Sequence, residues 1–139
     1  MLRIELAPWE KAKSQAQRIR VAVFVEEQGV PPELEMDEHD DRCMHALAFV
    51  GKEAVGTGRL LRDGHIGRMA VLKPWRGCGV GAALLRALVQ AARERGDGEV
   101  LLSAQVHALP FYRAQGFAPF GEVYEEAGIP HQAMRLRLA

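Results

Sequence analysis

A glycine-rich turn between an apolar stretch and a long helical pattern constrains this chain more than any other segment. Ile66–Gly81 reads IGRMAVLKPWRGCGVG, and the helical pattern Ala82–Arg95 follows it directly. Glycine has no Cβ, so a ligand can approach the backbone N–H groups of such a turn closely. The helix behind the turn adds unsatisfied N–H groups and a partial positive charge. The segment therefore predicts a strand, a turn and a helix that together bind a phosphate or pyrophosphate group.

Three phosphate-binding patterns can be compared with this turn. A P-loop is excluded because no Lys-Ser or Lys-Thr pair follows the glycines. The dinucleotide pattern GxGxxG/A is met by Gly77, Gly79 and Ala82, but Leu72–Arg76 separates the strand from the first glycine and the next strand ends without an acid. The third pattern, Arg-x-x-Gly-x-Gly, matches Arg76–Gly81. A helix start that binds no ligand remains the alternative.

A second motif follows at His107–Phe117, which reads HALPFYRAQGF. Arg76–Gly81 resembles the acyl-CoA pyrophosphate loop of the GNAT N-acetyltransferase superfamily, and His107–Phe117 resembles the later motif of the same superfamily, N-x-x-A-x-x-F-Y-x-x-x-G-F. His107 takes the place of its Asn, and an imidazole can also donate a hydrogen bond. Core packing is the alternative role for Phe111 and Tyr112. Val23–Pro31 and Gly128–His131 further resemble the ElaA/YjcF-like branch.

Composition narrows the class of protein. The 139 residues are expected to form a single domain, 1–139, with a core of ordinary size. The 18 basic and 18 acidic side chains cancel, so no basic field indicates nucleic acid. No apolar run predicts a membrane span or a signal peptide. With only two cysteines, a disulfide framework is not expected, and a cytoplasmic location is predicted.

The order of predicted elements is β-α-β-β-β-α-β-α-β-β. Asp63-Gly64 predicts a hairpin between two of the strands, and Gly96 predicts the end of the long helix. A strand at Glu99–Gln105 is expected to run parallel to His65–Val71, and the first helix is expected to end at Gln28-Gly29. The resemblance implies an α/β GNAT acyl-CoA N-acyltransferase fold, with a mixed central sheet of about seven strands and flanking helices. Pro31–Asp41 takes the place of the family's second helix, with at most one turn of its own.

The segment 33–41 is rich in carboxylates and is expected to form a loop. A solvated acidic surface is the favoured interpretation. The alternative is an acidic lip that attracts a cationic amine. The run His39-Asp40-Asp41 contains metal-ligand types, but nothing fixes a geometry, so no metal site is predicted. The acidic residues are Glu33, Glu35, Asp37, Glu38, Asp40 and Asp41.

The resemblance implies acetyl-CoA as the cofactor. The backbone N–H groups of Gly77–Gly81, with the cation of Arg76, would bind the pyrophosphate. The acyl arm would pair with the strand before the turn, where the N–H of Val71 would bind the developing oxyanion. The predicted cofactor-binding residues are Met69, Ala70, Val71, Arg76, Gly77, Cys78, Gly79, Val80, Gly81, His107 and Phe111.

Catalysis needs a proton donor for the leaving thiolate and a base for the ammonium nucleophile. Tyr112 is the predicted donor. Glu27 and His131 are the preferred bases among the candidates Glu26, Glu27, Glu35 and His131, although a water chain or simple surface roles would also fit. Cys78 can be a thiol nucleophile in principle, but a small neutral filler of the loop is favoured.

The predicted function is the transfer of an acetyl group from acetyl-CoA to a primary amine of a small molecule, peptide or protein. The alternative is a non-catalytic acyl-CoA-binding sensor or regulatory module. No nucleic acid or membrane partner is expected. A homodimer through exposed sheet edges is compatible with the sequence.

Overall fold

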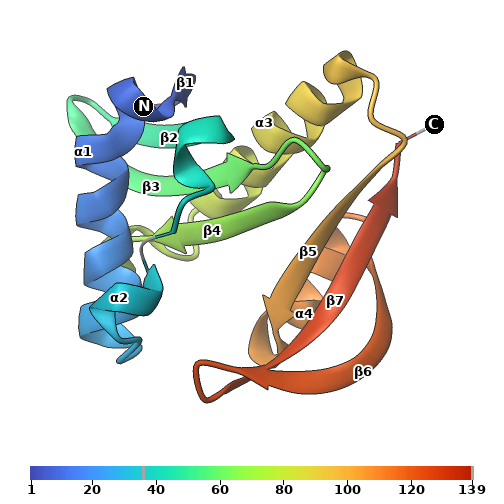
Figure 1. Ribbon diagram of the computed structural model, residues 1–139. Helices are drawn as coiled ribbons and strands as arrows, with labels where there is room; N and C mark the ends of the chain where they lie inside the picture. Colours follow the sequence, from blue (N-terminus) through green and yellow to red (C-terminus); the bar gives the residue numbers. More distant parts are fainter. Residues whose placement is uncertain (36, 139) are drawn as a thin grey trace.

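An antiparallel sheet of four strands forms the N-terminal half of the molecule (Figure 1). The computed structural model describes residues 1–35 and 37–138. Asp63-Gly64 lies in the turn that returns the chain antiparallel, as predicted from the sequence. The strands pair in chain order as β1 (Leu2–Pro8), β2 (Met44–Val50), β3 (Glu53–Leu60) and β4 (Ile66–Val71).

A second antiparallel sheet follows, with β7 (Ile129–Arg137) between β5 (Glu99–Gln105) and β6 (Ala118–Glu126). The predicted α/β fold is confirmed, but its strands form two sheets instead of one mixed sheet. The expected parallel pairing of β4 with β5 is reduced to one bridge, His65 to Leu101, where Leu101 N–H donates to Gly64 O at 3.0 Å. Beyond this bridge the two strands diverge (Figure 1).

A bulge in β4 contributes to this divergence. The register with β3 shifts so that Arg68 and Met69 both lie opposite Gly58, and Arg68 has a φ of 49°. A bulge of this kind bends and twists the strand that carries it. A Cβ on Gly58 would lie 2.4 Å from Met69 Sδ and 3.0 Å from Leu88 Cδ1. Gly58 therefore lets the side chains of Met69 and Leu88 pack closely against β3 at the bulge.

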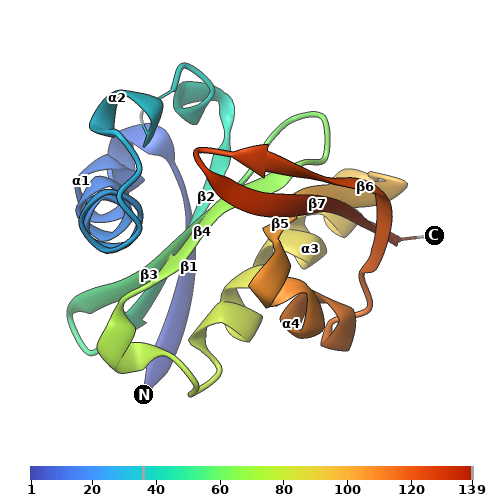
Figure 2. The same cartoon turned by 90° about the horizontal axis from the view of Figure 1, so that it is seen from below.

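Helices cover both faces of the first sheet (Figure 2). α1 (Trp9–Arg20) packs with residues such as Leu47 and Phe49 in one apolar cluster. α3 (Val80–Arg95) packs on the opposite face in a larger cluster that also includes Met134 of the second sheet. α3 ends at Gly96, whose φ of 91° fits the predicted C-cap. The shorter helical segments are α2 (Pro32–Glu35), η2 (Asp40–Arg42), η3 (Lys73–Trp75), η4 (Val106–Ala108) and α4 (Leu109–Ala114).

The first helix changes character at its C-terminal end. The sequence predicted one helix up to Gln28-Gly29, but α1 ends at Arg20 and continues as a π-helix, η1 (Val21–Glu27). Gln28 N–H donates to Val23 O at 3.1 Å, the i→i+5 bond of this geometry. In the part of the chain that the structure describes, every helix is too short or too polar to cross a bilayer.

Candidate active site

A cavity of about 870 Å3 opens between the diverging strands β4 and β5. Its walls also include η1, the glycine turn before α3, α4 and the β6–β7 hairpin. Cys78 is the one predicted site residue that does not line it. The structure thus brings together the remaining predicted residues, namely Glu27, Met69, Ala70, Val71, Arg76, Gly77, Gly79, Val80, Gly81, His107, Phe111, Tyr112 and His131.

The glycine turn presents an open helix start to the cavity. Gly77 and Gly79 have φ values of 77° and 88°, in the left-handed region that glycine adopts without strain. Gly79 is the N-cap of α3, and none of the described side chains caps this helix. The first N–H groups of α3 therefore remain to bind an anion. Cys78 is exposed, and its thiol donates a hydrogen bond to Trp75 O at 2.8 Å. Because it does not line the cavity, it is not placed to act as a nucleophile there.

Arg76 is paired with a carboxylate beside the glycine turn. Its guanidinium forms two bonds with the Glu27 carboxylate, at 2.5 and 2.7 Å, and its Nε donates to Val71 O at 2.9 Å. The hydrogen bond from Arg76 lowers the pKa of Glu27. Glu27 therefore stays ionised and paired, which disfavours it as the base, and Arg76 points to Glu27 instead of to the turn.

The edge of β4 that is not paired with β3 lies along the cavity. Leu72 N–H donates to Val55 O at 2.9 Å across the β3–β4 ladder. Antiparallel positions alternate between hydrogen-bonded and non-hydrogen-bonded pairs, so Val71, opposite Gly56, directs its N–H and C=O away from β3. The bond from Arg76 to Val71 O lies on this side. The Val71 N–H is thus positioned to bind a ligand that lies along β4.

Tyr112 lies in an apolar environment beside the turn. Its ring packs edge-to-face against Phe111 and Phe117, with centroid distances of 5.0 and 6.0 Å. Burial raises the pKa of Tyr112 to about 12. The phenol is therefore protonated at neutral pH and can donate a hydrogen bond or a proton to a ligand atom that carries negative charge.

His131 is buried at the far wall of the cavity. Its Nδ1 lies 2.7 Å from Ile129 O. Because a carbonyl oxygen only accepts, the neutral ring must carry its proton on Nδ1 and leave Nε2 free to accept one. Nε2 lies 3.7 Å from a carboxylate oxygen of Glu126. His131 therefore has the orientation and the tautomer that a base requires.

A chain of side chains crosses the cavity near His107. Its Nε2 lies 2.6 Å from Gln105 Oε1, and the Gln105 amide donates to Gln28 Oε1 at 2.9 Å. Gln28, Gln105 and Glu126 line the cavity but were missed by sequence reasoning. The sequence offers a signal for two of them, since Gln28 lies within the Val23–Pro31 motif and Glu126 lies two residues before the Gly128–His131 motif.

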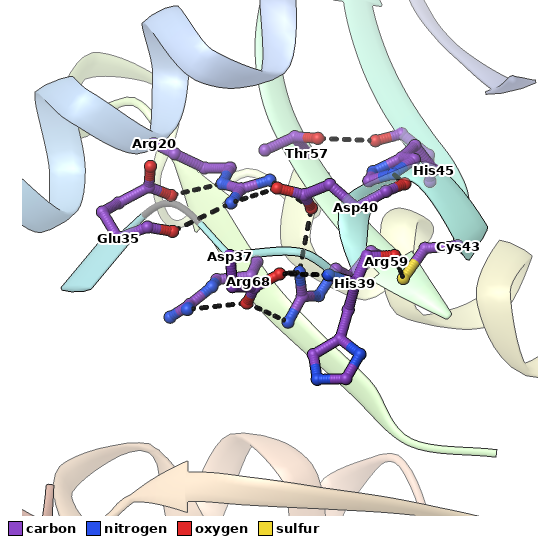
Figure 3. A network of polar contacts seen from close by, with 11 residues as sticks. Arg20, Glu35, Asp37, His39, Asp40, Cys43, His45, Thr57, Arg59 and Arg68 are labelled. Atoms are coloured by element: carbon purple, nitrogen blue, oxygen red, sulfur yellow. Dashed lines mark hydrogen bonds and ion pairs between the residues drawn. The ribbon is translucent and has the colours of Figure 1, made fainter. Parts of the chain in front are cut away.

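The acid-rich segment is a solvated surface only in part, because Glu33, Glu38 and Asp41 are exposed, whereas the other three acids are paired with arginines. Glu35 and Asp40 are buried, and both form ion pairs with the guanidinium of Arg20 (Figure 3). The guanidinium of Arg59 forms ion pairs with Asp40 at 2.9 Å and with Asp37 at 2.8 Å. Burial opposes the charge of Asp37, but hydrogen bonds and charge from Arg59 and Arg68 outweigh it and lower the pKa of Asp37. These carboxylates are therefore neutralised within the protein.

Two candidate bases are excluded by their positions. Glu35 lies in this buried network, and Glu26 lines a separate shallow hollow on the outer side of α1. Neither of them lines the cavity between β4 and β5. The cavity thus brings Glu27 and His131 together with Tyr112, and of these two bases only His131 lacks a guanidinium partner among the described residues.

Comparisons with known proteins agree with this geometry. Residues 10–138 match the family described as acetyltransferase (GNAT) domain. The uncharacterized N-acetyltransferase YjcF of Bacillus subtilis is 38% identical over 93% of this chain and 95% of its own. The crystal structure of Escherichia coli ElaA superposes with a TM-score of 0.86 at 32% identity, covering 99% of this chain and 100% of that one. An acyl-CoA N-acyltransferase from Pseudomonas aeruginosa gives a TM-score of 0.86 at 33% identity, covering 98% of this chain and 99% of that one. The chain therefore belongs to the GNAT acetyltransferase family, in the branch that contains YjcF and ElaA.

Proposed function

We propose that this protein transfers an acetyl group from acetyl-CoA to a primary amine. The observation that carries the proposal is that one cavity contains the uncapped start of α3, the free edge of β4, the phenol of Tyr112 and the imidazole of His131. These groups match the four tasks of the reaction, which are to bind the pyrophosphate, align the acyl arm, support the leaving sulfur and deprotonate the nucleophile.

The cofactor is bound mainly by backbone groups in this proposal. The N–H groups of Gly77–Gly81 bind the pyrophosphate, assisted by the helix dipole of α3. The acyl arm pairs with Met69–Val71 along the free edge of β4, and His107 and Phe111 border it. The N–H of Val71 donates to the oxyanion, a contact that contributes about 3 kcal/mol to the transition state of a typical acyl transfer.

The chemical step uses His131 as base. Nε2 of His131 takes one proton from the ammonium group, and the amine nitrogen then forms the bond to the acetyl carbonyl carbon. The C–S bond breaks, and its electron pair remains on the sulfur. The nitrogen loses its second proton to water once the C–N bond has formed. The products are an amide and a thiolate, with the first proton on His131, from which it also returns to water.

Tyr112 supports the departing sulfur. Full proton transfer from a phenol with a pKa of about 12 to a thiolate with a pKa near 8.5 would cost about 5 kcal/mol, taking 1.36 kcal/mol per unit. Tyr112 therefore stabilises the thiolate chiefly by a hydrogen bond, and the proton on sulfur in the product comes later from solvent.

The test is to measure CoA release with a panel of primary amines, together with calorimetry of CoA binding. Tyr112→Phe removes the hydroxyl and keeps the ring packing, so kcat should fall about 100-fold while the Kd for CoA changes less than threefold. Equal losses in kcat and in CoA affinity would contradict the role of Tyr112. Tight CoA binding with no turnover of any amine would contradict the activity itself and support the acyl-CoA-binding module.

A further inference from the structure

The β6–β7 hairpin carries a carboxylate to the acceptor side of the cavity. Glu126 ends β6 and pairs in register with Ile129 at the start of β7. Its side chain lines the cavity and is 62% exposed. We propose that Glu126 binds the ammonium group of the acceptor beside His131, so that the acceptor is a cationic, aliphatic primary amine. This inference rests on the proposed acetyl transfer and specifies its second substrate.

The geometry allows both side chains to contact one nitrogen. The Glu126 carboxylate oxygen and His131 Nε2 are 3.7 Å apart. A nitrogen placed about 2.9 Å from each would donate one hydrogen to the carboxylate and another to the imidazole. Since an ammonium group has three hydrogens, it can make both bonds at once. The ammonium group then transfers its proton to His131 along the hydrogen bond between them.

Among the carboxylates at the cavity, Glu126 is the one that is available to bind a cationic ligand. Glu27 and Glu126 are the two carboxylates that line the cavity within the described ranges. Glu27 binds Arg76 through both oxygens. Asp37, behind the wall at Arg68, binds Arg59 and Arg68. Glu126 has no guanidinium contact in the described part of the chain, and its carboxylate lies 3.7 Å from Nε2 of His131.

The hairpin fixes the position of this pair. The Tyr124 ring stacks on the His131 ring with centroids 6.0 Å apart, and its hydroxyl hydrogen-bonds Ser103 of β5. The bond from His131 Nδ1 to Ile129 O sets the direction of Nε2. Ala127, in the two-residue turn, has a φ of 52°, a strained conformation for a residue with a Cβ. Such strain is retained where a local geometry is required.

Apolar side chains also line this cavity. They include Ile66 of β4, Leu102 of β5 and Ile129 of the hairpin. These residues suit a stem of methylene groups below the ammonium nitrogen. The geometry therefore favours an alkylamine over an amine that is uncharged at neutral pH.

Butylamine, which is an ammonium ion at pH 7.5, is a suitable probe. It is titrated into the protein–CoA complex while the ring signals of His131 are followed by NMR, and His131→Gln identifies those signals among the 5 histidines. We expect a saturable shift of the His131 signals. Glu126→Gln should weaken butylamine binding about tenfold, because it removes one charge-assisted hydrogen bond. Butanol, which has no charge, should not compete.

The matched control is Glu125→Gln. Glu125 is the neighbouring exposed carboxylate on β6, and its side chain is on the opposite face of the strand and does not line the cavity. This variant should bind butylamine as the wild type does. Unchanged binding in Glu126→Gln, equal weakening in both variants, or His131 signals that do not move would each overturn the assignment. Because CoA carries no acetyl group, the titration is independent of turnover, and failure of acetyl transfer with intact binding would count against the proposed function alone.

Discussion

Two groups of acidic residues lie near the cavity, and they behave in opposite ways. The segment 33–41 has the highest density of carboxylates in the chain, yet Glu35, Asp37 and Asp40 are paired with arginines inside the protein (Figure 3). The β6–β7 hairpin places one carboxylate, Glu126, at the cavity with a histidine as its partner. The density of charge along a sequence therefore does not predict which charge a ligand can reach.

The difference follows from the cost of burying charge. A carboxylate removed from water must be compensated by cations and hydrogen bonds, and Arg20, Arg59 and Arg68 supply both to the segment 33–41. Glu126 stays largely in water and needs no such compensation. Removal of a carboxylate should consequently affect stability in the first region and ligand binding in the second.

The largest expected effect is on stability, in Glu35→Ala. This change leaves the guanidinium of Arg20, which is 1% exposed, without one of its carboxylates. We expect a loss of about 3 kcal/mol in the free energy of unfolding, measured by urea denaturation. Glu33→Ala, at an exposed position of the same short helix, should change it by less than about 0.5 kcal/mol. A loss below about 1 kcal/mol in Glu35→Ala would show that the buried network is not a stabilising requirement.

An intermediate effect is expected for the exposed pair Glu27–Arg76. Glu27→Gln releases the guanidinium of Arg76, which lies next to the glycine turn and can then contact the pyrophosphate. The Kd for CoA should fall about fivefold, the order of a single exposed ion pair. Glu26→Gln is the control, since Glu26 faces the outer side of α1. Weaker CoA binding in Glu27→Gln would instead show that the pair supports the turn, and calorimetry distinguishes the two outcomes.

The smallest effect concerns the hairpin itself. Ala127→Asn places a residue that tolerates the left-handed conformation before Gly128, the preferred order for a two-residue turn. The free energy of unfolding should rise by about 0.5–1 kcal/mol. Ala127→Val, which is β-branched, should lower it. If both variants have the stability of the wild type in urea, the turn is not strained and the hairpin gives no rigid support to Glu126.

The sequence predicted the parts of the fold that depend on local chemistry. Asp63-Gly64 specifies a turn, Gly96 specifies a helix end, and the spacing of the two family motifs gave the fold class. The split into two sheets was missed, because the bulge in β4 that contributes to it, opposite Gly58 of β3, is a local irregularity of one residue. A bulge of this kind produces no repeating pattern of residues, so it cannot be recognised from the periodicity of the sequence.

The candidate site was predicted in its backbone and only partly in its side chains. The glycines and Tyr112 belong to motifs that are continuous in the sequence. By contrast, Arg76 forms an ion pair with Glu27, which is 49 residues away in the sequence, and Arg59 forms one with Asp37, which is 22 residues away. No periodicity specifies which cation reaches which acid over such separations, so the pairing of Arg76 with Glu27 and the burial of Glu35 and Asp40 were not predicted.

The π-helix η1 makes one wall of the cavity tolerant of a change in chain length. Its wide turn brings Val23 and Phe24, and then Glu27 and Gln28, to the same wall. Because a π-turn accommodates one residue more than an α-turn, deleting one residue between Val21 and Phe24 would restore an ordinary α-helix and leave the residues after it close to their present direction. One codon could therefore be lost there without separating Glu27 from Arg76 or Gln28 from Gln105.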